Sequence, residues 1–143
     1  MNGRRRLAPE LGLAAILCAM FGAGPALADL APGEEDYRTR CAACHGERGL
    51  GDGPIAFYFT APPPPLAQLA ARNDGAFPRE RVIAIIDGRE WRNAHGGRAM
   101  PIWGELFEAS AKESLKGEGG DAEALVEERL GQLVDYLKTL QQP

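Results

Sequence analysis

The sequence predicts an all-α fold in which a few helices are joined by long loops. The clearest helix is the C-terminal one, where apolar residues recur at alternating spacings of four and three. These residues are Val126, Leu130, Leu133, Leu137 and Leu140. Loops are predicted where glycine and proline cluster, above all at the four consecutive prolines of residues 62–65. No segment carries a convincing strand pattern.

The first expected helix covers residues 33–44. Tyr37, Cys41 and Cys44 follow one another at spacings of four and three, which places them on one helical face. A loop over residues 46–65 follows, because its glycines and prolines exclude regular structure.

Two further helices are expected in the middle of the chain. Residues 78–87 combine an opening proline with an apolar run, and Gly88 suits the C-terminal cap. A short helix is expected within residues 104–110. Residues 116–120 then form a glycine-rich connector.

The final helix is expected to begin after Asp121 as its N-cap and to run to about Gln141. Gly131 lies in its middle and costs about 1 kcal/mol relative to alanine. That cost predicts that another backbone crosses the helix closely at Gly131.

The segment Cys41-Ala42-Ala43-Cys44-His45 is the C-x-x-C-H signature of a c-type haem attachment site. Two thiols three positions apart can each add to a vinyl group of one porphyrin. The adjacent histidine then lies beneath the ring, where its imidazole can ligate the iron. We therefore expect one covalent haem c, held by Cys41 and Cys44, with His45 as an iron ligand.

Two other interpretations of this motif are less consistent with the sequence. A thioredoxin-like pair needs a preceding apolar strand, but residues 34–40 are strongly charged. A zinc site needs further cysteines or histidines, and only Cys18 and His95 remain.

The N-terminal segment has the three parts of an export signal. Arginines at positions 4–6 precede an apolar run over residues 11–21, and residues 26–28 read Ala-Leu-Ala. The run is shorter than the ~20 residues that a membrane-spanning helix needs. Residues 1–28 are therefore predicted to be a signal peptide that is cleaved after Ala28, and the passenger Cys18 is lost with it.

The remaining residues, 29–143, are expected to form one small domain in the periplasm. Cleavage removes three arginines and Glu10, so the formal net charge falls from −4 to −6. This balance argues against nucleic acid or anionic lipid as a partner, and we expect no stable membrane insertion of the mature chain.

The second iron ligand is expected from Met100. It is the only methionine in residues 29–143, and Pro101 follows it in a loop without helical periodicity. A lone methionine is otherwise an ordinary filler of the core. His95, flanked by two glycines, is the alternative ligand.

Taken together, these residues resemble a class I cytochrome c over about residues 33–141. Gly33 and Tyr37 match the glycine and aromatic residue of that family's N-terminal helix, and residues 133–138 resemble its C-terminal helix. Met100 with Pro101 matches the loop of the distal ligand. The resemblance implies a small cytochrome c fold, in which the N- and C-terminal helices cross and loops wrap around a covalently bound haem.

The resemblance also assigns roles near the haem. Asp52-Gly53-Pro54 resembles the loop whose proline carbonyl receives the other N–H of the axial histidine, so Pro54 is expected to orient His45. The tetraproline run could shift this role to another proline. Trp91 and Trp103 are expected either in the ordinary core or against the haem edge.

Two axial ligands leave no open position on the iron, which predicts a one-electron carrier rather than an enzyme. Its partners would be a redox donor and a redox acceptor, bound transiently. Two alternatives remain open. One is a haem subunit of a dehydrogenase or oxidase complex, and the other is a ligand-binding or catalytic haem protein with an open distal site.

A final expectation concerns docking. All basic residues between Arg38 and Arg98 are arginines, whereas acidic residues dominate the C-terminal third. Arg89, Arg92 and Arg98 flank the Met100 loop and are predicted to form a mildly basic rim that guides an acidic partner. The alternative is that these arginines pair with local acids or with haem propionates.

Overall fold

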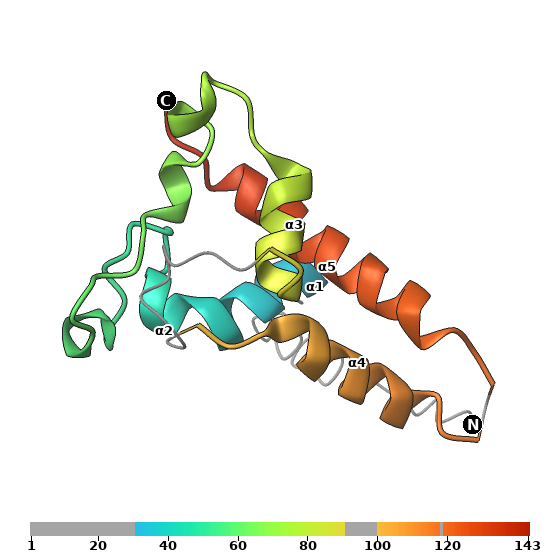
Figure 1. Ribbon diagram of the computed structural model, residues 1–143. Coiled ribbons are helices and arrows are strands. Elements are labelled where there is room, and N and C mark those ends of the chain that lie inside the picture. Colours follow the sequence, from blue (N-terminus) through green and yellow to red (C-terminus); the bar gives the residue numbers. More distant parts are fainter. Residues whose placement is uncertain (1–30, 91–99, 118) are drawn as a thin grey trace, which may run out of the picture.

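The computed structural model describes residues 31–90, 100–117 and 119–143, and Figure 1 shows its arrangement. The described residues form helices and loops without strands, which confirms the predicted all-α class. The five α-helical segments are α1 (Pro32–Asp36), α2 (Ala42–His45), α3 (Arg79–Asp87), α4 (Trp103–Ser114) and α5 (Ala122–Thr139).

The first expected helix is present but is not a regular α-helix. A π-helical turn, Tyr37–Cys41, joins α1 to α2, and the N–H of Ala42 bonds to the carbonyl of Tyr37, five residues back. Single π-helical turns within α-helices are frequent at functional sites. Here the turn leads directly into the C-x-x-C-H motif.

The loop after α2 contains three short 3₁₀ turns, Ala56–Tyr58, Leu66–Gln68 and Ala71–Asn73. α3 begins after Pro78 and ends at Gly88, which adopts a left-handed conformation (φ 88°) as expected of a C-cap glycine.

The last two helices differ in how well the sequence predicts them. α4 is longer than expected, because Phe107 and Ala111 continue its buried stripe and Glu108 pairs with Lys112 one turn on. α5 has the predicted cap. The Asp121 carboxylate accepts hydrogen bonds from the N–H groups of residues 123 and 124, at 3.0 and 3.3 Å.

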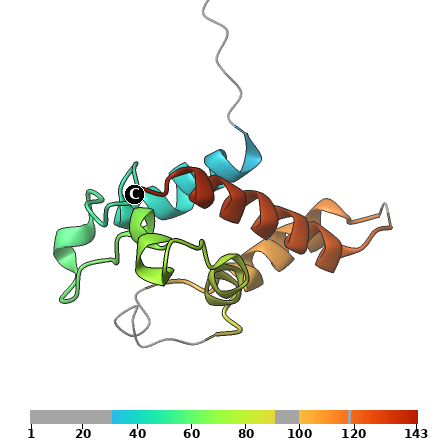
Figure 2. The ribbon, with the colours of Figure 1, turned by 90° about the horizontal axis from the view of Figure 1, so that it is seen from above.

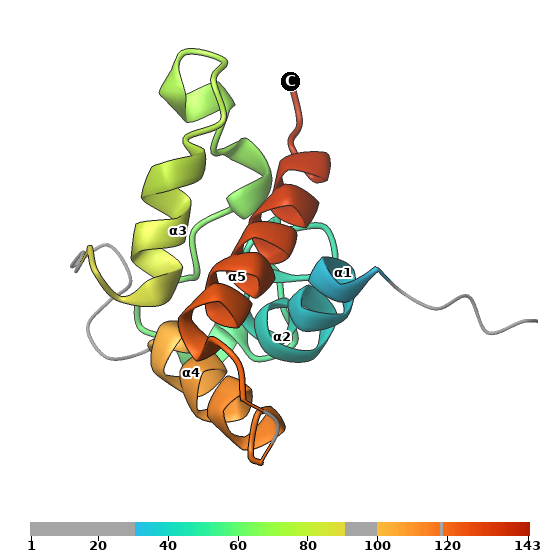
Figure 3. The same cartoon turned by 90° about the vertical axis from the view of Figure 1, so that its right-hand side faces the viewer.

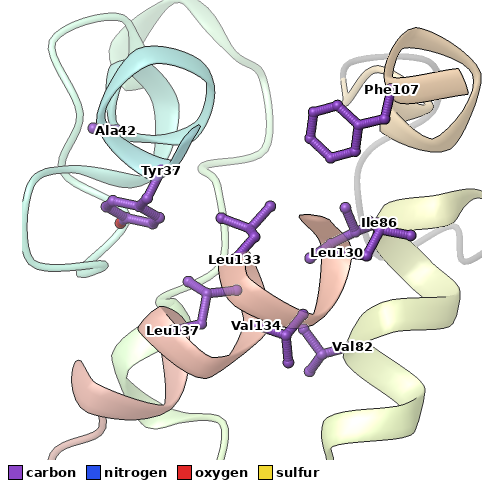
Figure 4. Close-up of a cluster of buried hydrophobic side chains, with 9 residues drawn as sticks. All are labelled: Tyr37, Ala42, Val82, Ile86, Phe107, Leu130, Leu133, Val134 and Leu137. Atoms are coloured by element: carbon purple, nitrogen blue, oxygen red, sulfur yellow. The ribbon is translucent and has the colours of Figure 1, made fainter. Parts of the chain in front are cut away.

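The core is assembled around α5 (Figure 4). In Figures 2 and 3, α5 lies between α1 on one side and α3 on the other, and α4 packs against its N-terminal half. Helices α1, α3 and α4 all pack on α5, which supplies four of the nine core residues. The buried core residues are Tyr37, Ala42, Val82, Ile86, Phe107, Leu130, Leu133, Val134 and Leu137.

The N- and C-terminal helices cross at Gly33. A methyl group at this position would overlap the carbonyl of Gln132 in α5, so the two backbones are in direct contact. One turn further along, at the start of the π-helical turn, the ring of Tyr37 packs against that of Tyr136, with centroids 5.3 Å apart. The predicted crossing of terminal helices is therefore present.

The prediction for Gly131 is wrong. Over the described parts of the chain, the nearest foreign atom to a methyl group placed there is an Arg79 guanidinium nitrogen, at 3.3 Å, and no backbone of another element lies within 4 Å. The glycine that permits the crossing lies on α1 and not on α5. Among the described residues, no helix combines the length and the apolar character that crossing a membrane requires.

Candidate functional site

The C-x-x-C-H motif lies at the C-terminal end of the first helical stretch, and its end is held by the loop that follows. The Tyr37 hydroxyl, fully buried, donates a 2.6 Å hydrogen bond to the carbonyl of Gly46, directly after the motif. The N–H groups of Gly53 and Ile55 bond to the carbonyls of Cys44 and Ala43, at 3.2 and 3.1 Å. The loop thereby satisfies carbonyls that a helix end leaves without partners.

Gly53 makes this contact possible. A methyl group at Gly53 would overlap the carbonyl of Ala43, so only glycine lets the loop approach the helix end. The segment expected to face the imidazole ring of His45 therefore lies against the backbone of the motif instead, and Pro54 itself is exposed.

The assignment of Pro54 is corrected by the structure. The buried His45 ring has its Nδ1 atom 3.1 Å from the carbonyl oxygen of Pro64, in the tetraproline run. Because a carbonyl can only accept, Nδ1 carries the proton, and in the neutral imidazole the lone pair lies on Nε2. The predicted type of contact is present, but a different proline makes it.

Pro64 is held in place by contacts on the residues that follow it. The N–H of Ala67 bonds to the carbonyl of Gly49, at 2.9 Å, and the N–H of Gln142 bonds to the carbonyl of Ala67, at 2.8 Å. The Gln141 side chain bonds to both the carbonyl of Leu66 and the N–H of Ala70, each at 2.9 Å. The C-terminal end of the chain thus fixes the loop that orients His45.

The motif opens onto a cavity made of two adjoining hollows. Both hollows are lined by Cys41, His45, Pro64, Met100 and Trp103. The helix-side hollow is completed by Leu66, Leu69, Val82, Ile85, Ile86 and Leu137. The loop-side hollow is completed by Cys44, Arg40, Phe59, Ala61, Pro62, Pro63 and Pro101.

Polar side chains are few in this cavity. In the helix-side hollow, apart from His45, they are Arg72, Asn73 and Arg81, all of which are exposed and therefore lie at its rim. The walls are otherwise apolar. A large apolar group with polar substituents at one edge suits this environment.

A charge cluster lies behind the loop-side wall. Asp36 is only 6% exposed, and its carboxylate accepts hydrogen bonds from Arg129 at 2.6 and 2.7 Å and from Arg40 at 3.0 Å. Burial alone would raise the pKa of Asp36, but the two guanidinium groups outweigh it and hold this pKa below its usual value.

The two arginines also contact aromatic rings. The Arg129 guanidinium lies 4.3 Å from the ring centroid of Phe107, and that of Arg40 lies 5.8 Å from the ring of Trp103. Arg40 therefore joins the cluster to the wall of the cavity.

The Cys41 thiol lies in a setting that disfavours its anion. Burial, with the negative charge of Asp36 as a smaller cause, raises the pKa of Cys41 to about 12. Cys41 and Cys44 are not joined in a disulfide. Both cysteines line the cavity and are available to attach a group covalently through thioether bonds.

Comparison with family models decides what kind of protein this is. The model described as Cytochrome c matches residues 30–141, most of the chain. The chain belongs to the cytochrome c family. As a cytochrome c it binds haem c covalently, and the apolar cavity beside its two cysteines fits that group. No curated protein and no solved structure matches the chain.

Most of the site residues that the sequence predicts line the same cavity of this cytochrome c. Cys41, Cys44, His45 and Met100 all line the cavity, and so does Trp103. The signal segment, Trp91, His95, Arg92 and Arg98 lie outside the described residues. Arg89 does not line the haem cavity; it pairs with Asp87 beside a groove between α3, α4 and α5.

Arg40 and Phe59 line the wall but were not predicted as part of the site, whereas Pro64 belongs to the tetraproline run that the sequence offered as the alternative to Pro54. Arg40 directly precedes Cys41, so its proximity could have been anticipated from the sequence. For Phe59 the sequence offers no signal, because its role depends on how the loop folds back across the motif.

Proposed function

We propose that this cytochrome c is an exported one-electron carrier with a single haem c. The haem would be attached through Cys41 and Cys44, and its iron would be ligated by His45 and Met100. The observation that carries the proposal is that a thioether and an imidazole line the same apolar cavity as both cysteines.

When bound, the haem iron takes up and releases one electron. His45 would serve as a neutral ligand, because its Nδ1–H donates to Pro64 and its lone pair is on Nε2. Met100 would supply the second ligand, a thioether sulfur. Thioether ligation favours the ferrous state and raises the reduction potential relative to two histidines.

Polar groups at the rim suggest which residues would bind the carboxylates of the haem. Arg72, Asn73 and Arg81 could hold its two propionates, because cationic and amide groups donate hydrogen bonds to carboxylates. Phe59, Ala61 and Pro62, which line the loop-side hollow together with Cys44, would help to enclose the bound haem.

The proposed location is the periplasm, with residues 1–28 removed. It is supported by the basic and apolar regions of that segment and its Ala-Leu-Ala end. In this compartment the protein would exchange electrons with transient redox partners.

The distal ligand is the decisive test of this proposal. The oxidised protein should show the weak red-end absorption band of an iron–sulfur bond. Met100→Ala should abolish that band, lower the reduction potential and let CO bind the ferrous haem. His95→Ala is the matched control and should retain the wild-type spectrum.

Other results would show a different ligation of the haem iron or a different role. If Met100→Ala leaves the spectrum unchanged while His95→Ala alters it, the haem is ligated by two histidines. If the wild type binds CO readily, the distal site is open and the role is ligand binding or catalysis. Mass spectrometry tests the proposed cleavage and the covalent attachment. The mature protein should begin at Asp29 and carry one haem that stays bound in acid.

A further inference from the structure

The loop beside the haem cavity exposes an unusual amount of apolar surface. Phe57 and Tyr58 are 74% and 76% exposed, and their rings pack on each other with centroids 3.9 Å apart. Ile55, at 39%, adds to the same turn. Aromatic rings prefer burial, so an exposed cluster of this kind indicates a surface that another molecule covers.

The position of this turn ties it to the haem. Ile55 is hydrogen-bonded to Ala43, inside the C-x-x-C-H motif, and Phe59 lines the loop-side hollow. The exposed rings therefore lie between an anchor on the motif and a wall of the cavity. A molecule that covered them would approach the side of the cavity at which Cys41 and Cys44 lie.

The lack of charge in this segment indicates what kind of surface the covering molecule would present. From Gly53 to Ala71 the chain contains no charged residue. A partner that docks here would meet aromatic, aliphatic and proline side chains. This segment itself therefore provides none of the electrostatic guidance that a rim of arginines would give.

We propose that Ile55, Phe57 and Tyr58 form an aromatic patch through which this cytochrome docks an apolar surface of a redox protein. The proposal rests on the electron-carrier function proposed above. The two rings together would bury about 300 Å². This is about half of the ~600 Å² per partner that the largest of the weak redox interfaces bury.

Electron self-exchange tests the patch without a known partner, because two copies must bring their haem edges together. The rate would be measured by NMR in mixtures of oxidised and reduced protein. The double variant Phe57→Ser/Tyr58→Ser should exchange at least tenfold more slowly. Leu106→Ser is the matched control, because Leu106 is apolar, 50% exposed and on α4, and it should stay within twofold of wild type.

Voltammetry on coated gold electrodes tests the chemistry of the docking surface. Wild type should transfer electrons faster on a methyl-terminated monolayer than on a carboxylate-terminated one, and the double variant should lose this preference. A preference for carboxylate that the double variant retains would favour an arginine rim and overturn the patch.

Two further outcomes would also overturn the proposal. One is self-exchange at the wild-type rate in the double variant. The other concerns phosphatidylcholine vesicles: if wild type sediments with them and the double variant does not, while the self-exchange rate is unchanged, the rings bind a membrane surface. Unaltered spectra and potentials in all variants would show that the haem site is intact. A failure of the carrier function itself would instead appear in wild type, as an open distal site.

Discussion

Helix α5 makes contact with α1 and with α3 in two different ways. Towards α1 the backbones touch at Gly33, and the buried carboxylate of Asp36 receives two hydrogen bonds from Arg129. There is no adjustable side chain between the two helices at the crossing point. This contact therefore fixes the distance between α1 and α5.

Towards α3 the contact is adjustable. The Arg79 side chain extends over Gly131, and its guanidinium lies 3.2 Å from the exposed carboxylate of Asp135. Exposed ion pairs of this kind contribute little, typically 0–1 kcal/mol. Long side chains can shift without moving either helix.

The difference between the two contacts matters for haem binding, because α1 continues through the π-helical turn into Cys41 and His45. A fixed crossing holds the haem-binding motif in a defined place relative to the core. The α3 contact closes the helix-side hollow through its apolar residues, and its charged part can vary. Substitutions at the contact of α5 with α1 should therefore have larger effects than substitutions at its contact with α3.

Gly33→Ala should have the largest effect. The added methyl group would overlap the carbonyl of Gln132, and neither backbone can move aside without separating the helices. We expect the free energy of unfolding to fall by about 3 kcal/mol or more. Urea unfolding of the purified holoprotein, followed by circular dichroism, measures it, and an unchanged midpoint would contradict a backbone contact.

Asp36→Asn should have the second-largest effect. It leaves two guanidinium groups without their anion, and breaking a buried pair costs about 3–5 kcal/mol. Because Arg40 and Arg129 are partly exposed, we expect about 2–3 kcal/mol. Asp135→Asn, on the other face of α5, is the control and should cost less than 1 kcal/mol.

The interaction of Asp36 with Arg40 and Arg129 also predicts how the free energy of unfolding depends on pH. The folded state holds the pKa of Asp36 below its usual value, so the stabilisation is complete above the unfolded pKa of about 3.9 and is lost as the pH falls further. Unfolding at pH 7, 4 and 3 should therefore show a constant gap between wild type and Asp36→Asn down to about pH 4. The gap should then narrow. A gap of equal size at pH 3 would mean that the charge of Asp36 is not what stabilises the crossing.

The sequence predicts the helices well because their periodicity and caps are local properties. The buried stripe of α5, its Asp121 cap and the Gly88 end of α3 are all present. The C-x-x-C-H motif is equally local, since its chemistry depends on a spacing within five residues.

What the sequence does not predict depends on contacts between distant segments. The partner of His45 could be assigned only by knowing that the loop lays Gly53 against the motif and brings Pro64 across the ring. The pairing of Asp36 with Arg129 joins residues at opposite ends of the domain. The glycine at a helix crossing is similarly ambiguous, because either helix can supply it.

Gly131→Ala should have the smallest effect of the three substitutions, and its sign should be opposite. Alanine is a better helix former by about 1 kcal/mol, and within the part of the chain that the structure describes the one foreign atom near the added methyl group belongs to the movable end of Arg79. We expect the free energy of unfolding to rise by up to ~1 kcal/mol, with no change in the haem spectrum. Urea unfolding under the conditions used for Gly33→Ala measures it. A loss of stability would mean that α3 approaches α5 as closely as α1 does, and the two faces would then be equivalent.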